Sequence, residues 1–322
     1  MKKVIFNLLY NTLLTRNVIL PFKKGIRYIF VFHDISNTSS FHNSSTYSTD
    51  VKVFENNVDW IQKHFKIVDL DKLTDESYRD EHHSNLASIV FDDGFYSVLE
   101  TALPYLHKKN ISFTIFANQT AIQENWLWCS SLLIARKNNN IKYLENIFSK
   151  TPVHNKLSFE KFLNDPVTFI CESKLPDDDY SIFREPEYES SKIYLDEKDI
   201  KFLFSEGVII GNHTKTHKHL STCSDEIIRQ EIIENKEYLE KLLNTQINHF
   251  AIPFGFHTTY NAYALKIAHE AHAHVYDTTK NYLKPSNQGL IPRVALQNEN
   301  KSKLFSYVNY PLIRNINQDE VL

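Results

Sequence analysis

Two adjacent carboxylates, Asp92 and Asp93, follow a short apolar run and precede a glycine in ASIVFDDGFYS, residues 87–97. An apolar run without alternation is typical of a strand buried on both faces, as in a parallel sheet, and ligands of α/β sheets bind where such strands end. Two acids at that position form a candidate site. Taken alone, the same residues are equally typical of a solvated Asp-Asp-Gly turn.

Two histidines, His213 and His217, stand with three residues between them in GNHTKTHKHLS, directly after another apolar run. On a helical turn this spacing places both imidazoles on one face, where they can bind one divalent metal. With a carboxylate from a neighbouring strand end they form a two-histidine, one-carboxylate site that leaves positions open for water and substrate. The spacing alone is often coincidental, and the strand-end position of both motifs is what favours a metal site.

Alternating strand and helix patterns position these residues. Apolar runs predict strands at 28–33, 65–70, 87–91, 111–117, 208–211 and 247–251 and near 275, and helical periodicity is found at 51–64, 97–109, 224–243 and 260–272. Repeated βα units predict one α/β domain over residues 1–322, a distorted (β/α) barrel of about seven βα units. A polar, largely helical stretch at about 123–198 indicates an insertion that can cover a site or bind an acceptor.

The composition excludes several function classes. With 322 residues and 42% hydrophobic residues the chain can bury a large core, and a formal net charge of -3 gives no basic field for nucleic acid, so no nucleic-acid partner is expected. Three cysteines, Cys129, Cys171 and Cys223, lie far apart in an odd number. They argue against a disulfide framework and against a structural zinc site.

The first twenty residues carry apolar side chains at helical spacing among basic ones. The stretch is too short and too polar to span a bilayer, and no small-residue cleavage pattern follows it. Two interpretations remain, a basic amphipathic helix on a membrane surface and a helix packed on the core of the domain. We therefore expect a cytoplasmic protein, with peripheral contact to the inner membrane under the first interpretation.

Three motifs resemble those of the polysaccharide deacetylases, carbohydrate esterase family 4. They are FDDG at 91–94, HTKTH at 213–217 and AIPFG at 251–255, and together they span about half the chain. The resemblance implies that Asp92 is the catalytic base and that Asp93, His213 and His217 bind one divalent metal. Zn²⁺ is the expected metal, with Co²⁺, Ni²⁺ or Mn²⁺ as alternatives.

Two features of that family are missing. Ala251 stands where family members usually have an arginine, two residues before the proline of the third motif, and no late Leu-x-His segment supplies the catalytic acid. However, FVFHDIS at 30–36 looks like the relocated acid motif of the permuted branch that includes poly-N-acetylglucosamine deacetylases, which makes His33 the expected general acid. Arg293, in LIPRVAL, is the expected substitute for the arginine as a partner of Asp92, with a surface position as the alternative.

Amide hydrolysis requires the same groups. A metal lowers the pKa of its water, a carboxylate removes the proton, and the oxyanion needs positive charge, for which a backbone N–H near Phe254 is a further candidate. We expect carboxylate surroundings to keep His33 protonated near neutral pH, so that it protonates the leaving nitrogen. Trp126 and Trp128 are candidates to stack on a sugar, with packing as the alternative.

The expected activity is metal-dependent removal of N-acetyl groups from an amino sugar, in a cell-envelope polysaccharide or its lipid-linked precursor. An O-acetyl esterase is the alternative enzyme, because the attack on the carbonyl is shared. A catalytically silent glycan-binding protein is the alternative outside enzymes, although a binder needs neither a base nor an acid.

Overall fold

The computed structural model describes residues 25–37, 47–78, 85–151, 156–172, 191–278, 289–298, 303–304 and 306–308. The amphipathic stretch at 1–20, with its membrane interpretation, lies outside these residues. Within the described part of the chain, no helix combines the length and the apolar character that crossing a membrane requires.

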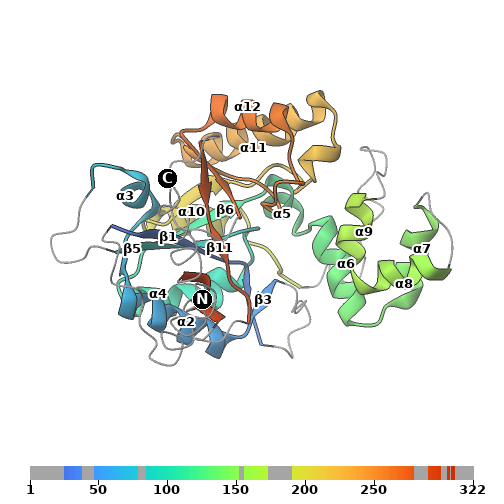
Figure 1. The fold of residues 1–322 in the computed structure, drawn as a ribbon, viewed down its shortest axis with the longest axis horizontal. Helices are drawn as coiled ribbons and strands as arrows, with labels where there is room; N and C mark the ends of the chain where they lie inside the picture. The colour runs from blue at the N-terminus through green and yellow to red at the C-terminus, as the bar shows by residue number, and fades with distance from the viewer. Residues whose placement is uncertain are drawn as a thin grey trace, which may run out of the picture.

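A nine-stranded parallel sheet forms the centre of the molecule (Figure 1). Its strands are β1 (Arg27–Phe32), β4 (Lys66–Ile67), β5 (Leu86–Phe91), β6 (Phe113–Ala117), β7 (Ile209–Asn212), β8 (His249–Ala251), β9 (His274–Asp277), β10 (Leu290–Pro292) and β11 (Val294–Ala295). The order is β10-β9-β8-β7-β6-β5-β1-β11, with β4 also paired to β5. Every residue of β1, β5 and β6 is buried, as expected for a parallel sheet covered on both faces.

One short segment joins the two ends of this sheet. β10 pairs with β9 and β11 pairs with β1, and only Arg293 separates β10 from β11. The sheet is therefore curved into a nearly closed barrel, which confirms the predicted distorted (β/α) barrel. A separate two-stranded sheet, β2 (Asp34–Ile35) with β3 (Ser48–Thr49), lies beyond the end of β1.

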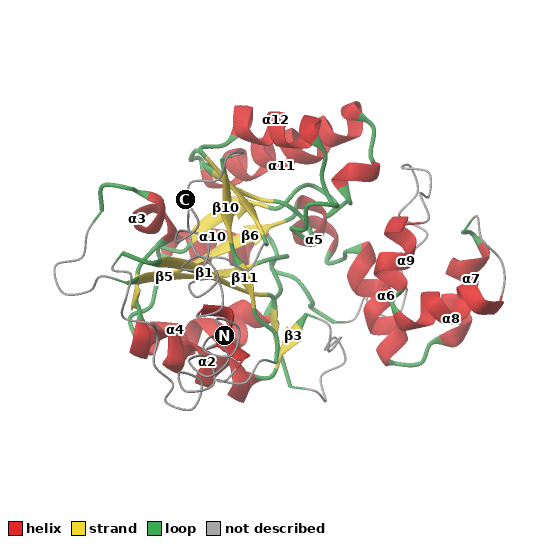
Figure 2. Ribbon diagram, in the orientation of Figure 1, coloured by secondary structure: helices red, strands yellow, loops and turns green. Residues whose placement is uncertain are grey.

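Helices surround the barrel. They are α2 (Val51–His64), α3 (Leu70–Thr74), the π-helix Val98–Ala102 continued by α4 (Leu103–Lys108), α5 (Gln119–Glu124), α10 (Glu197–Ser205), the 3₁₀ turn Leu220–Thr222, α11 (Asp225–Leu243) and α12 (Ala262–Ala271). In Figure 2, α2 and α4 lie on one side of the strands and α11 and α12 on the opposite side. Ser224 caps the start of α11, since its hydroxyl accepts from the Ile227 N–H at 3.3 Å.

Four helices form a separate body beside the barrel (Figure 1). They are α6 (Trp128–Lys137), α7 (Ile141–Ser149), α8 (Lys156–Asn164) and α9 (Pro166–Glu172), and they share a core that includes Leu132, Leu144 and Phe162. We call them the helical insertion. The chain returns to the barrel through an antiparallel bridge between Tyr194 and Phe95, and the Leu195 N–H donates to the Gly94 carbonyl at 2.9 Å. The helical insertion is thereby attached next to the Asp-Asp-Gly turn.

Candidate active site

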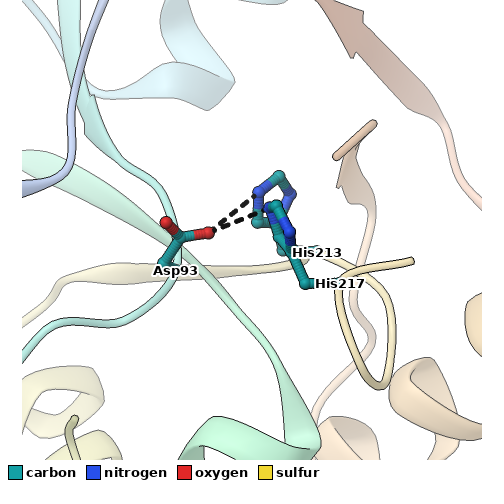
Figure 3. A group of neighbouring side chains, drawn as sticks. All are labelled: Asp93, His213 and His217. Carbon is teal, nitrogen blue, oxygen red and sulfur yellow. Dashed lines mark ion pairs between the residues drawn. The ribbon is translucent and has the colours of Figure 1, made fainter. Parts of the chain in front are cut away.

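Asp93, His213 and His217 meet at the carboxyl ends of the barrel strands (Figure 3). Asp93 follows β5 and His213 follows β7, and all three side chains are buried. Asp93 Oδ1 lies 3.4 Å from His213 Nε2 and 3.2 Å from His217 Nε2. The structure therefore brings the three expected ligands together.

The three ligand atoms fit a divalent metal. Asp93 Oδ1 is buried, and no donor among the described residues makes a well-directed hydrogen bond to it. Atoms about 2.0–2.2 Å from a tetrahedral Zn²⁺ lie about 3.3–3.6 Å from one another, which is close to the observed separations. An oxygen and two imidazole nitrogens are also ligands that Zn²⁺ accepts.

The charges of this group reinforce that fit. Burial alone would raise the pKa of Asp93, but the neighbouring histidines hold it well below its usual value. Burial lowers the pKa of His217, yet the charge of Asp93 outweighs it and raises that pKa to about 9. Burial also lowers the pKa of His213, but the charge of Asp92 and then that of Asp93 outweigh it, so this pKa is raised. A bound cation would take the place of these imidazole protons.

The turn that carries Asp93 has unusual backbone geometry. Asp93 and Gly94 both adopt left-handed conformations, with φ of 70° and 72°. Glycine accepts this conformation without strain, whereas aspartate is one of the few other residues that tolerate it. The FDDG stretch is thus a tight turn that directs Asp93 toward the histidines, and its two acids are buried rather than solvated.

The prediction that His213 and His217 share a helical turn is wrong. The segment between them is a loop in which Thr214 and His217 have positive φ of 68° and 58°. Several of its backbone groups bond to residues far away in the sequence. Asn118 Nδ2 donates to the Thr214 carbonyl at 2.9 Å, and Glu231 Oε2 accepts from the Thr216 N–H at 2.8 Å.

A buried asparagine cluster supports this loop and was missed from the sequence. Asn118, Asn212 and Asn235 are fully buried. Asn235 Nδ2 donates to Asn212 Oδ1 at 2.6 Å, and that same oxygen accepts from the Thr214 N–H at 2.9 Å. The signal that could have revealed the first two is their position, since Asn118 directly follows the apolar strand β6 and Asn212 ends the apolar strand β7.

The expected pairing of Arg293 with Asp92 is confirmed. Arg293 Nη1 lies 2.8 Å from Asp92 Oδ1 and Nη2 lies 3.0 Å from Oδ2, and both side chains are buried. Burial would raise the pKa of Asp92, but the guanidinium charge outweighs it and the pKa is lowered. Arg293 stands where β10 passes into β11, so closure of the barrel places it opposite Asp92.

His33 follows β1 directly, beside the turn that holds Asp92. β1 and β5 pair with Phe32 opposite Phe91, and the Asp92 N–H donates to the Phe32 carbonyl at 2.9 Å. The Nδ1 atom of His33 is buried, with no hydrogen-bond partner among the described residues. Burial lowers the pKa of His33 although Asp92 and Asp93 act in the opposite direction. Burial thus outweighs the two carboxylates, whereas we expected them to dominate and raise the pKa of His33.

Phe254 lies at the centre of a tight turn in the third motif. Its φ is 61°, and the Gly255 N–H donates across it to the Pro253 carbonyl at 2.7 Å. The Phe254 ring packs against His217, with ring centroids 4.7 Å apart. Gly255 has a φ of 70°, and a Cβ there would lie 2.1 Å from Thr278 Oγ1, so only glycine fits.

The two tryptophans differ in their surroundings. Trp128 is only 1% exposed within the helical insertion, and its Nε1–H donates to the His217 carbonyl at 3.1 Å. It has no free face for a sugar, so the stacking interpretation is wrong for Trp128 and the packing alternative holds. Trp126 is half-buried, which leaves part of its ring accessible, and it remains a candidate for sugar contact.

Comparison with known proteins gives a family match. Residues 79–276 match the family model described as polysaccharide deacetylase. The match includes the Asp-Asp-Gly turn, both histidines and the third motif, whereas His33 and Arg293 lie outside it. A search of curated proteins found no match.

Several solved structures share the fold. A deacetylase from Streptococcus pyogenes, PplD, solved in complex with acetate, is 14% identical with a TM-score of 0.60, and the match covers 89% of this chain and 99% of that one. IcaB from Ammonifex degensii is 14% identical with a TM-score of 0.58, covering 89% and 98%. A de-N-acetylase from Aggregatibacter actinomycetemcomitans is 11% identical with a TM-score of 0.55, covering 87% and 99%. At these identities the likeness establishes the fold alone.

Proposed function

This chain belongs to the polysaccharide deacetylase family, and we propose that it is a metal-dependent hydrolase that removes N-acetyl groups from an amino sugar in a cell-envelope polysaccharide or its lipid-linked precursor. One observation carries the proposal: Asp93 Oδ1 and two histidine Nε2 atoms converge directly beside the buried, ionised Asp92. The de-N-acetylase among the similar structures supports an amide as the bond that is cleaved.

Asp93, His213 and His217 would hold the metal, for which Zn²⁺ is the best fit and Co²⁺, Ni²⁺ or Mn²⁺ are alternatives. When bound, the metal supplies a Lewis acid that polarises the acetyl carbonyl and lowers the pKa of the attacking water. The backbone N–H of Phe254, whose ring packs against His217, is the proposed second stabiliser of the oxyanion.

Asp92 is the proposed general base. Its ion pair with Arg293 keeps the carboxylate ionised and fixes both oxygens, so that it can accept a proton from water without first losing its own. Arg293 thus acts through Asp92 and contacts no substrate in this proposal. The proximity of His33 and Arg293 to Asp92, although both lie outside the matched region, supports the permuted arrangement of the motifs.

His33 is the proposed general acid. An amine leaves only after its nitrogen is protonated, and His33 follows the strand next to that of Asp92. Its lowered pKa makes the protonated imidazole a stronger acid. An ester leaving group needs less help from an acid, so loss of His33 should impair amide cleavage more than cleavage of an O-acetyl ester, the alternative activity.

A location at the membrane remains part of this proposal. The basic, amphipathic pattern of residues 1–20 supports a cytoplasmic enzyme that contacts the inner face of the membrane, where lipid-linked glycan precursors occur. The proposed partners are therefore an acetylated glycan or lipid-linked sugar, together with anionic lipid.

Acetate release from a panel of N-acetylated and O-acetylated glycans and lipid-linked sugars tests the proposal. We expect release from an N-acetylated member that stops with chelator and returns with Zn²⁺. The double variant His213→Ala/His217→Ala should be inactive, whereas His219→Ala, which removes a half-buried histidine of the same loop, should keep its metal. Release from O-acetylated members alone would favour the esterase, and no release would favour the catalytically silent glycan-binding protein.

A further inference from the structure

The two histidine ligands are supported by different parts of the molecule. His213 Nδ1 lies 2.8 Å from the carbonyl oxygen of Ala251, the last residue of barrel strand β8. His217 Nδ1 instead lies 3.7 Å from Cys129 Sγ, in the first turn of α6. Trp128, the residue before Cys129, donates its Nε1–H to the His217 carbonyl at 3.1 Å. These two contacts of His217, one with its imidazole and one with its carbonyl, therefore both come from the helical insertion.

We propose that Cys129 and Trp128 are positioning residues for the metal ligand His217, so that the helical insertion completes the metal centre. This inference rests on the proposed metal site and adds a role for the insertion.

The backbone of His217 explains why such support is needed. It has a positive φ of 58°, outside any helix or strand, in a conformation that costs free energy for a residue other than glycine. The surrounding structure must hold this conformation. The bond from Trp128 fixes the carbonyl of His217, and the His217 N–H donates to Thr214 Oγ1 at 3.1 Å.

Cys129 fixes the imidazole ring. A histidine that ligates through Nε2 carries its proton on Nδ1, and an acceptor at Nδ1 selects this tautomer and the ring orientation. In this chain the sulfur of Cys129 is that acceptor. The Phe254 ring packs against the imidazole at 4.7 Å between centroids and restricts its tilt. Together these contacts direct Nε2 toward Asp93 Oδ1.

The helical insertion is anchored well enough for this role. Cys129 and Trp128 are buried, only 4% and 1% exposed. Ser130, the next residue of α6, bonds through its hydroxyl to Tyr194 on the returning chain. That chain is bonded next to the Asp-Asp-Gly turn, since the Leu195 N–H donates to the Gly94 carbonyl. The helical insertion therefore contacts the His217 side of the metal centre directly and is tied to the Asp93 side through the returning chain.

Metal affinity of the full-length chain, measured by competition between Zn²⁺ and a chromophoric chelator, tests this inference without any substrate. Loss of an outer partner of a ligating histidine weakens metal binding by about 10- to 100-fold, and we expect this for Cys129→Ala. Cys129→Ser, which keeps an acceptor, should recover part of the loss. Trp128→Phe, which keeps a ring but removes the N–H, should also weaken binding.

Ser131→Ala is the matched control, because it also removes one side-chain atom from a buried position on α6, where the hydroxyl bonds to the Leu127 carbonyl. It should bind Zn²⁺ like the wild type. The visible absorption spectrum of bound Co²⁺, which reports ligand geometry, should change in Cys129→Ala and not in Ser131→Ala. If Cys129→Ala and Ser131→Ala have equal unfolding midpoints, weaker Zn²⁺ binding by Cys129→Ala alone reflects the positioning of His217 and not a general loss of stability.

Wild-type affinity in both Cys129→Ala and Trp128→Phe would overturn the inference and leave the proposed function intact. Equal weakening in Ser131→Ala would also overturn it, because the effect would then be one of general packing. A wild-type chain that binds no metal would overturn the proposed function, and with it the inference that rests on it.

Discussion

Replacing Arg293 by methionine should expose the cost of burying Asp92 without its partner. The pair has two short contacts, of 2.8 and 3.0 Å, and both side chains are buried. At an effective dielectric constant of about 20, two unit charges about 4 Å apart attract by about 4 kcal/mol. Breaking such a buried pair on one side costs about 3–5 kcal/mol of stability.

The stability of the wild type and that of Arg293→Met should depend on pH in opposite directions. In the wild type the pKa of Asp92 is lowered, so the pair stabilises the fold above the ordinary carboxylate pKa, and this contribution is lost as the pH falls through the lowered value. In Arg293→Met, burial without the guanidinium raises the pKa of Asp92, so the folded state binds the proton more tightly than the unfolded state does. Stability of the variant should then fall as the pH rises.

Urea unfolding of the chelator-treated protein at about pH 5 and about pH 8 measures both effects. Arg293→Met should lose more free energy of unfolding at the higher pH. Arg293→Lys keeps the charge without the two-pronged geometry and should lose less, and the double variant Arg293→Met/Asp92→Asn should recover part of the loss. A loss below about 1 kcal/mol at pH 8, or one that does not change with pH, would refute this reasoning.

Three further predictions concern other parts of the chain. His33→Ala should keep its metal while its rate of acetate release falls on the order of 10²- to 10⁴-fold, and a nearly active variant would reject the permuted acid. Burial lowers the pKa of His272 to about 4, so the unfolded state binds a proton more readily than the folded state as the pH falls. The wild type should therefore lose about 2 kcal/mol of stability between pH 7 and pH 5, and His272→Gln should not. Urea unfolding that shows the same pH dependence for both proteins would contradict this. Removing residues 1–17 should release the protein from anionic vesicles and spare turnover of a soluble substrate, whereas unfolding on truncation would assign the stretch to the core.

The barrel and the meeting of Asp93 with the two histidines could be predicted because their signals are local. An apolar run that ends in Asp-Asp-Gly, and another that ends before two histidines, place both groups at the same end of a parallel sheet. From the sequence, Arg293 could be named only as a candidate partner of Asp92, because the two residues lie 201 positions apart. Their pairing depends on closure of the barrel between β10 and β11, which no local pattern encodes.

The incorrect predictions concern properties that depend on distant neighbours. The loop from His213 to His217 is not helical because Asn118 and Glu231, far away in the sequence, bond to its backbone. Trp128 is buried because the helical insertion packs around it, which composition could not reveal. The lowered pKa of His33 follows from burial, which only the folded chain reveals, whereas the nearby acids in the sequence indicated only the weaker influence that raises this pKa.

Titrating metal-depleted protein with Zn²⁺ while following acetate release from an N-acetylated glycan substrate tests the central claim most directly. Asp93, His213 and His217 form the one group of potential ligands found in the described residues, so we expect activity to rise linearly and to level off at about one equivalent. Asp93→Asn should require much more Zn²⁺ for the same activity. Full activity in protein shown to be free of metal would contradict the account.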